Sequence, residues 1–141
     1  MGMTTAERYH DFSAGHRVYG HESKCAHFHG HNYRVHFKVA GELDKVGRVM
    51  DFSVIKTLLC EWLEREWDHK MILGINDPQA KDIQSLDPEG VVLVHFNPTA
   101  ENMAEYLVTE VAPLQLKDTG VTLVECRIEE TRKCSATYTK E

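Results

Sequence analysis

The sequence predicts a single α+β domain in which helices pack on one face of an antiparallel sheet. The chain has 141 residues, close to the ~150 of an average domain, so residues 1–141 are expected to form one unit with its own core. Apolar residues make up 42% and charged residues 27%, shares that exclude disorder. The predicted segments follow the order β-β-α-β-α-β, which is expected when helices gather on one side of a sheet.

The first two predicted strands are consecutive in the chain. From Asn32 to Ala40 apolar and polar side chains alternate strictly, which is typical of a strand buried on one side only. The apolar positions are Tyr33, Val35, Phe37 and Val39, and the polar ones are Arg34, His36 and Lys38. A shorter strand is expected from about Arg8 to Ala14, and the glycine-punctuated stretch 15–30 connects the two.

Helical spacing of apolar residues predicts two helices. Asp51 can cap the first, which continues to near Trp67. Its apolar positions are Phe52, Ile55, Leu59, Trp62 and Leu63. Thr99 can cap the second, which Pro113 is expected to end. The apolar stripe of the second helix consists of Met103, Tyr106, Leu107 and Val111.

The remaining segments are shorter. Residues 70–90 carry two Asp-Pro pairs and two glycines, which predicts a long loop. The run 91–96 is apolar and predicts a short strand, and the stretch 121–130 alternates as a last strand. Glu130 continues the face of that strand that carries Val124, Cys126 and Ile128. We therefore expect either a frayed strand end or a buried hydrogen-bond acceptor at Glu130.

The balance of charge argues against some classes of partner. Sixteen basic and twenty-two acidic residues give a net charge of −6, which disfavours a protein that coats nucleic acid or an anionic membrane. No apolar run approaches the ~18 residues needed to cross a bilayer, and the first residues lack the layout of a signal peptide. The four cysteines are therefore interpreted as free thiols, and a cytoplasmic location is expected.

Histidines are the most unusual feature of the composition. There are nine, and five of them fall between His16 and His31. His29 and His31 are separated by one glycine at the start of a predicted strand, so both side chains project to its apolar face. His16 ends the earlier strand and reaches the same point if the two strands pair. Three neutral imidazoles without an obligate fourth protein ligand are typical of a catalytic zinc, whose open position holds water or substrate oxygens.

Two alternatives to a catalytic zinc follow from the same residues. Paired histidines on a strand are often unliganded, in which case any metal binding would be adventitious. Cys25 as a fourth ligand would instead close the coordination shell and make the zinc structural. Four further histidines are interpreted as solvent-facing or at the edge of the core, namely His21, His27, His36 and His95. His36 shares a face with Arg34 and Lys38, so it is predicted to point away from the site.

Six short motifs occur in order along nearly the whole chain. They are Phe12–His16, Cys25–Tyr33, Val49–Phe52, Asp68–His69, Pro98–Asn102, and Glu130–Thr131 with Tyr138. Together they resemble the motifs of the 6-pyruvoyl-tetrahydropterin synthase family, which includes the 6-carboxy-tetrahydropterin synthases of queuosine biosynthesis. The resemblance implies the tunnelling fold, a four-stranded antiparallel sheet with two helices that assembles into trimeric barrels and then hexamers, with active sites between subunits.

The resemblance also implies roles for individual residues. The substrate would be 7,8-dihydroneopterin triphosphate, whose side-chain hydroxyls a zinc ion at His16, His29 and His31 would hold. The other implied roles are proton transfer by Cys25, a second acid/base pair from a neighbouring subunit at Asp68 and His69, a pterin anchor at Glu130, and substrate contacts at Glu101 and Thr99. Spacing alone does not support the Asp-His pair, because adjacent residues in a helix do not face each other.

The spacing inside one motif bears on the reaction. Three residues separate Cys25 from His29, which within the family is typical of the 6-carboxy-tetrahydropterin synthases, whereas the pyruvoyl-forming type has a longer spacing. The resemblance thus favours a lyase that releases acetaldehyde and triphosphate on the route to 7-deazaguanines. Pyruvoyl formation or a folate-pathway variant is the alternative reaction, and an oligomer that binds zinc and pterin without turnover is the alternative of another class.

Overall fold

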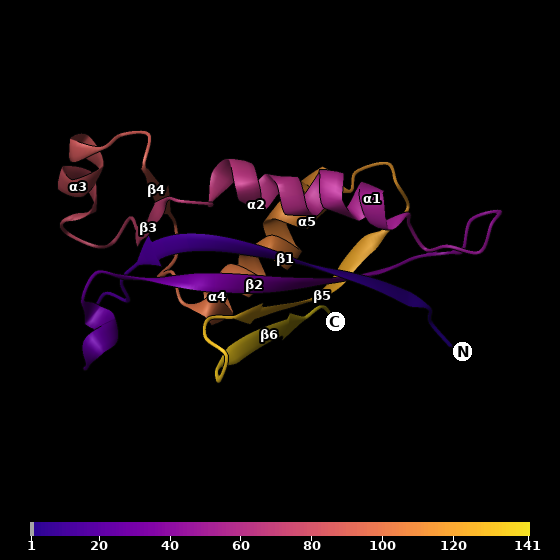
Figure 1. Ribbon diagram of the computed structural model, residues 1–141, viewed down its shortest axis with the longest axis horizontal. Helices are drawn as coiled ribbons and strands as arrows, with labels where there is room; N and C mark the ends of the chain where they lie inside the picture. The colour runs from indigo at the N-terminus through magenta and orange to yellow at the C-terminus, as the bar shows by residue number, and fades with distance from the viewer. Residues whose placement is uncertain (1) are drawn as a thin grey trace.

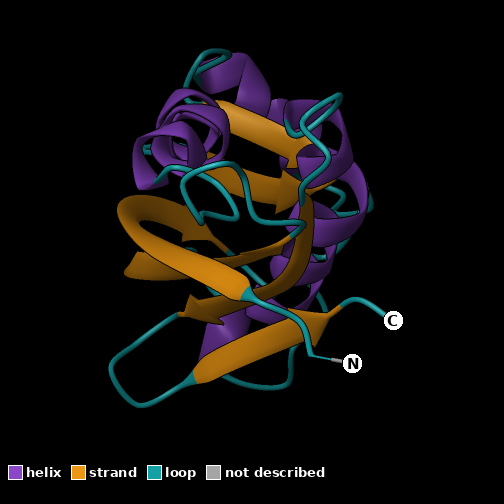
Figure 2. Cartoon of the chain, turned by 90° about the vertical axis from the view of Figure 1, so that its right-hand side faces the viewer, coloured by secondary structure: helices purple, strands orange, loops and turns teal. Residues whose placement is uncertain are grey.

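The structure is a computed structural model that describes residues 2–141, and it has the predicted α+β architecture (Figure 1). Six strands form one sheet in the order β4-β3-β1-β2-β5-β6. Their bounds are Thr5–His16 (β1), His29–Ala40 (β2), Met71–Gly74 (β3), Val91–Val94 (β4), Thr122–Glu129 (β5) and Ser135–Thr139 (β6). Strands β1, β2, β5 and β6 pair antiparallel, and together they form a curled sheet (Figure 2). The sheet has six strands rather than the expected four, because β3 and β4 extend it, and the predicted strand 91–96 pairs parallel and not antiparallel.

The long hairpin of β1 and β2 is the centre of the sheet. Its register pairs Thr5 with Ala40 at one end and His16 with His29 at the other. Both strands are longer than predicted, because the alternating pattern continues through polar residues at their ends. The predicted apolar face of β2 is fully inside, with exposures of 0–1% for Tyr33, Val35, Phe37 and Val39.

Two continuous helical segments cover this apolar face (Figure 1). The first consists of α1 (Phe52–Ile55), a π-helical turn η2 (Lys56–Cys60) and α2 (Glu61–Glu66), and the second of α4 (Ala100–Tyr106), a π-helical turn η3 (Leu107–Val111) and α5 (Ala112–Gln115). The predicted caps form, since Asp51 accepts from the Ser53 amide and Thr99 from that of Asn102. None of the helices within residues 2–141 is long and apolar enough to cross a membrane.

The prediction that Pro113 ends the second helix was wrong. Pro113 lies in the first turn of α5, and the helix continues to Gln115. A proline ring inside a helix normally clashes with the carbonyl four residues back. Here the wider π turn η3 comes directly before α5, so the helix is already opened at the point where the ring must fit.

The prediction of a long loop over residues 70–90 was also wrong. This segment forms β3 and the helix α3 (Ala80–Leu86), and it leads into β4. Strand β3 pairs parallel with both β1 and β4, and Leu73, Ala80 and Val91 form a small core of their own. These elements are too short for a periodic pattern to stand out among the Asp-Pro pairs. Strand β6 was missed for a similar reason, since none of its residues is fully buried.

Gly74 is expected to be essential for the close packing of this β3-α3-β4 unit. A Cβ atom at Gly74 would lie 2.8 Å from the backbone oxygen of Phe96, which cannot move aside. We expect Gly74→Ala to lower the free energy of unfolding by about 1–3 kcal/mol, as other overpacking changes do, measured by urea denaturation. Gly15→Ala is the control, because there the close atom is the flexible Met71 methyl group. Equal losses in the two variants would contradict this explanation.

Candidate metal centre

Three histidines converge where β1 ends and β2 begins. His16, His29 and His31 each offer a ring nitrogen, and these three atoms all lie within 4.8 Å of one another. The ring centroids are 4.6 to 5.1 Å apart. The hairpin register produces this cluster, because it places His16 opposite His29, and the two-residue period of β2 returns His31 to the same face. The predicted convergence of the three side chains is present.

Backbone carbonyls fix the protonation of two of these rings. His16 Nδ1 lies 2.7 Å from the Pro98 carbonyl oxygen, and His29 Nδ1 lies 2.7 Å from that of His27. A carbonyl oxygen can only accept, so each Nδ1 must carry the proton and each neutral ring leaves Nε2 with a lone pair. The two Nε2 atoms lie 3.1 Å apart. Two nitrogens bound to one tetrahedral metal ion at ~2.05 Å are about 3.3 Å apart.

The third ring completes a set that fits a metal cation. His31 Nε2 is buried and has no hydrogen-bond partner among the described residues. Burial lowers the pKa of both His16 and His31, so these rings are held in the neutral form that ligates metals. The lone pairs on Nε2 of His16 and His29 face each other at 3.1 Å, which is unfavourable in a buried site without a proton or cation between them. The donor set therefore fits one metal ion, held by three imidazoles.

Two further polar groups border the third ring. A carboxylate oxygen of Glu130 lies 3.3 Å from His31 Nε2, and the Glu130 side chain is 24% exposed. Tyr33 follows His31 on the same face of β2, and its ring centroid is 5.4 Å from that of His31. The Tyr33 hydroxyl is buried without a hydrogen-bond partner among residues 2–141. Burial, and secondarily the charge of Glu130, raise the pKa of Tyr33, so it is a neutral donor beside the cluster.

Cys25 lies in the connection between two of the histidines. It is the middle residue of a 3-10 turn, η1 (Lys24–Ala26), in the loop that leaves His16 and returns to His29. The thiol is free and partly exposed, and it does not belong to the group of mutually close ligand atoms. The geometry therefore favours a three-histidine centre over a closed one with a cysteine ligand. The other three cysteines are free as well.

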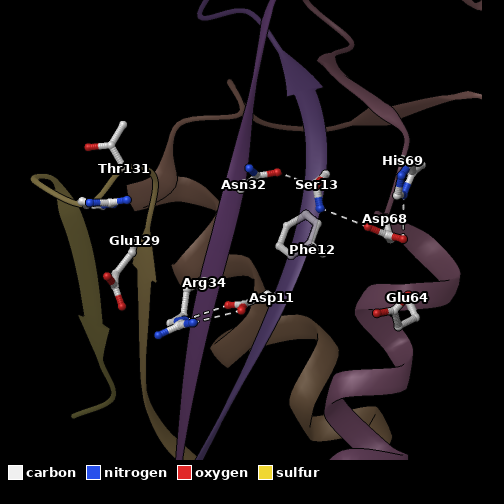
Figure 3. A pocket seen from close by; sticks show the side chains of 11 residues that line it. Asp11, Phe12, Ser13, Asn32, Arg34, Glu64, Asp68, His69, Glu129 and Thr131 are labelled. Carbon is white, nitrogen blue, oxygen red and sulfur yellow. Dashed lines mark hydrogen bonds and ion pairs between the residues drawn. The ribbon is translucent and has the colours of Figure 1, made fainter.

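Asp68 and His69 form a pair beside a cavity whose lining includes none of the three histidines (Figure 3). His69 Nδ1 lies 2.8 Å from an Asp68 carboxylate oxygen. Adjacent residues achieve this because the helix has ended and His69 adopts a left-handed conformation with φ of 60°. The Ser13 amide donates to the other Asp68 oxygen at 3.0 Å. The imidazole of His69 is 80% exposed, and the cavity beside it measures about 780 Å³.

The Asp68 carboxylate is ionised in this arrangement. Burial acts to raise its pKa, but the Ser13 amide and the His69 ring outweigh burial and hold the pKa of Asp68 below its ordinary value. Neither Asp68 nor His69 belongs to the three-histidine group. Ser13 and Asn32, which line the cavity beside the pair, occupy the strand positions that alternate with those of the metal-site histidines. The pair is therefore not directed at the metal centre of its own chain.

Comparison with known proteins places the chain in a family. The model of a family described as 6-pyruvoyl tetrahydropterin synthase matches residues 5–141. The chain belongs to this family. A 6-carboxy-5,6,7,8-tetrahydropterin synthase of Rickettsia typhi is 36% identical over 134 residues, which cover 94% of this chain and 97% of that protein. The 6-carboxy-5,6,7,8-tetrahydropterin synthase of Aquifex aeolicus is 30% identical to this chain. The match covers 92% of this chain and 94% of that protein.

Solved structures agree with this assignment. The 6-pyruvoyl tetrahydropterin synthase of Caenorhabditis elegans superposes with a TM-score of 0.70 at 27% identity, covering 100% of this chain and 98% of its own. A protein of Wolinella succinogenes gives a TM-score of 0.86 with full coverage of both chains at 24% identity, which shows the shared fold. The prediction that the chain has the α+β fold of the tunnelling-fold proteins is confirmed, and so is the prediction of an enzyme, a lyase of the 6-pyruvoyl tetrahydropterin synthase family.

Thr99 has a structural role, because it caps the helix α4. Its hydroxyl accepts from the Asn102 amide at 3.1 Å and so caps α4. Glu101 lies in the first turn of the same helix and is exposed, where the helix dipole favours an acidic residue. Thr99 directly follows Pro98, whose carbonyl orients His16. The start of α4 is thus fixed to the metal centre.

Replacement of Thr99 by alanine tests the capping role. We expect Thr99→Ala to lower the free energy of unfolding by about 1 kcal/mol, measured by thermal or urea denaturation. Thr99→Ser keeps the hydroxyl and should retain the wild-type stability. If the two variants were equally stable, the cap would contribute nothing measurable.

The groups that orient two of the three histidines could not be found from the sequence. The acceptors are backbone carbonyls of His27 and Pro98, and a carbonyl is present at every residue, so no side-chain pattern marks the ones that matter. Tyr33 was assigned to the core, which it does enter, with 1% exposure. Its unpaired hydroxyl is the only sign of a second role. His36, which shares the polar face of its strand with Arg34 and Lys38, contacts Glu129 at 2.5 Å and is not one of the three converging histidines.

Proposed function

We propose that the protein is a zinc-dependent lyase. It converts 7,8-dihydroneopterin triphosphate to 6-carboxy-5,6,7,8-tetrahydropterin, releasing acetaldehyde and triphosphate, and serves queuosine biosynthesis in the cytoplasm. The observation that carries the proposal is the set of three imidazoles whose ring nitrogens converge on one point, two of them oriented by backbone carbonyls. It is supported by the relative of Rickettsia typhi, which is named 6-carboxy-5,6,7,8-tetrahydropterin synthase.

Zinc suits this centre because it favours tetrahedral coordination by imidazole and leaves an open position when three protein ligands are present. His16, His29 and His31 would hold it. Bound zinc supplies Lewis acidity toward the side-chain hydroxyls of the substrate, which makes the neighbouring C–H groups more acidic. The carbonyls of Pro98 and His27 keep two of the rings in the ligating orientation, as outer partners do in metal sites generally.

Cys25 is proposed to move protons at the substrate side chain. A cysteine accepts a proton as its thiolate and donates one as its thiol, so it can serve as base or acid. Cys25 lies in the loop between two proposed zinc ligands, so it stays near the centre without occupying it. Only three residues separate it from His29, which supports the carboxy-forming reaction over the pyruvoyl-forming one.

Asp68 and His69 are proposed as the second acid/base pair, acting on the substrate bound to a neighbouring subunit. The carboxylate holds the imidazole at 2.8 Å and leaves the ring exposed. This exposure, and the location of the pair at a cavity outside the three-histidine group, support supply in trans. An active site shared between chains requires an oligomer, and we propose a trimer or a hexamer built from two trimers.

Glu130 is proposed to bind the pterin ring. A carboxylate can accept two N–H groups from the amino-pyrimidinone edge in a bidentate pair. Glu130 is partly exposed and lies beside His31, so a ring anchored there would present its side chain to the metal. Thr99 and Glu101, at the start of α4, are proposed as further substrate contacts.

The product assay tests the proposal directly. Purified protein without a polyhistidine tag is incubated with 7,8-dihydroneopterin triphosphate, and acetaldehyde, triphosphate and the pterin product are measured. Acetaldehyde in equal amount to 6-carboxy-5,6,7,8-tetrahydropterin is expected. Triphosphate with a pyruvoyl pterin and no acetaldehyde would assign the alternative reaction. Pterin binding without any product would leave a non-catalytic binding oligomer.

A further inference from the structure

The loop of residues 17–28, termed the Cys25 loop, has few internal contacts that could fix its conformation. It starts directly after His16 and ends directly before His29. Its one regular element is the 3-10 turn η1, which has no buried residue. One backbone hydrogen bond spans it, from the Val18 amide to the Cys25 carbonyl at 2.7 Å. A surface loop with so little packing opens readily, whereas a proton-transferring group must be held within ~0.5 Å of its working position.

A buried carboxylate outside the loop supplies the missing tether. Asp77 follows β3 and is 4% exposed, the lowest exposure of any carboxylate among residues 2–141. Its two oxygens accept from Arg17 Nε at 2.6 Å and from Arg17 Nη2 at 2.5 Å. The Gln79 amide donates to the same carboxylate at 3.0 Å. The guanidinium, opposed by burial, holds the pKa of Asp77 below its ordinary value. Bidentate pairs of this kind fix orientation as well as distance.

The same guanidinium gathers both ends of the Cys25 loop. The Arg17 guanidinium carbon lies 4.5 Å from the ring centroid of Phe28 and 5.8 Å from that of Tyr19. Arg17 Nη2 also donates to the Gln79 side-chain oxygen at 2.9 Å. Phe28 directly precedes His29, and Arg17 directly follows His16. The contact between Arg17 and Phe28 therefore joins the two loop residues that lie next to the proposed metal ligands. Stacking on an aromatic face is a contact that arginine makes and lysine does not match.

A second tether comes from the end of the same β3-α3-β4 unit. Asn97 donates from Nδ2 to the Tyr19 carbonyl at 3.0 Å, and its Oδ1 accepts from the Tyr19 amide at 3.2 Å. The next residue is Pro98, whose carbonyl orients His16. The loop is therefore attached at two points to residues 77–97, which otherwise contribute nothing to the proposed chemistry.

We infer that Asp77, Arg17 and Asn97 are positioning residues that hold the Cys25 loop against the metal centre, and that the β3-α3-β4 unit serves as the anchor for this loop. The inference rests on the proposed role of Cys25 in proton transfer. None of the three touches the reacting atoms. These residues act on turnover through the position of the Cys25 loop. Metal binding should change less, because the proposed ligands are held by β1 and β2.

The test uses Asp77→Asn, Arg17→Lys and Asn97→Ala in the full-length protein. Hydrogen exchange of peptides covering residues 17–28 is expected to accelerate about tenfold or more in each variant. The value of kcat should fall on the order of 10²-fold, as small misplacements of catalytic groups do, with KM changed less and metal content unchanged. Asn97→Ala leaves the buried pair of Asp77 and Arg17 intact. If Asp77→Asn does not fold, Asn97→Ala therefore still tests whether these contacts hold the loop.

Asp11→Asn is the matched control for exchange. Asp11 and Arg34 form a similar bidentate pair, at 2.8 and 3.0 Å, with the guanidinium over Tyr9, but this pair lies on the sheet and not on the loop. It should leave exchange of residues 17–28 unchanged. The inference is overturned if the three variants only lower the melting temperature while loop exchange and kcat stay at wild-type values. Absence of product in the wild type would refute the proposed function. The exchange measurement would still show whether Asp77, Arg17 and Asn97 hold the Cys25 loop in place.

Discussion

Replacing His29 by alanine is expected to abolish stable metal binding and to lower kcat/KM by about 10³-fold or more. The variant leaves two imidazoles, and the Lewis acidity lost with the ion is worth several kcal/mol in the transition state. Metal content of tag-free protein and product formation are measured on the same preparation. Treatment of the wild type with a chelator should reproduce the loss, and added zinc should restore the wild type and not the variant.

His95→Ala provides the control for this experiment. His95 is an exposed histidine, 3.0 Å from Glu110 and outside the three-histidine group, so its removal should change neither metal content nor turnover. Circular dichroism shows whether His29→Ala remains folded, as we expect from the hairpin pairing that surrounds it. One metal ion per chain retained in His29→Ala would refute the assignment of this residue as a ligand.

The cluster of three histidines could be predicted because side-chain periodicity determines it. Alternation along Asn32–Ala40 fixes which way His29 and His31 point, and both belong to the face that the structure buries. The position of His16 required one more assumption, that the first two strands pair, and the register between Thr5–His16 and His29–Ala40 fulfils it. A two-residue period is sensitive to a shift by one residue, so the convergence of three rings depends on that register.

Other features could not be predicted because they depend on backbone atoms or on tertiary contacts. The contact between Asp68 and His69 requires a left-handed backbone at His69, which a non-glycine residue adopts only where its surroundings compensate. The continuation of the helix past Pro113 depends on the π turn before it. The strand Met71–Gly74 is only four residues long, and a parallel strand of that length has no recognisable alternation.

Replacing Cys25 by alanine is expected to lower kcat by 10²- to 10⁴-fold, the range typical of a lost general acid or base, while metal content stays at the wild-type level. The reason is that the thiol lies in the loop beside the centre and is not one of the converging ligand atoms. Product formation and metal content are again measured together. Cys134→Ala is the control, since Cys134 is a free and exposed thiol outside the centre.

The pairing of these two measurements separates the roles that a cysteine beside three histidines can have. If Cys25→Ala lost its metal, Cys25 would be a fourth ligand, and the closed structural site would replace the open catalytic one. If the variant kept both its metal and its wild-type product profile, the thiol would have no part in turnover, and a binding oligomer or a different proton carrier would have to be considered. Loss of turnover with retention of metal requires a cysteine that acts on the substrate from outside the coordination shell, and the Cys25 sulfur is not one of the converging ligand atoms.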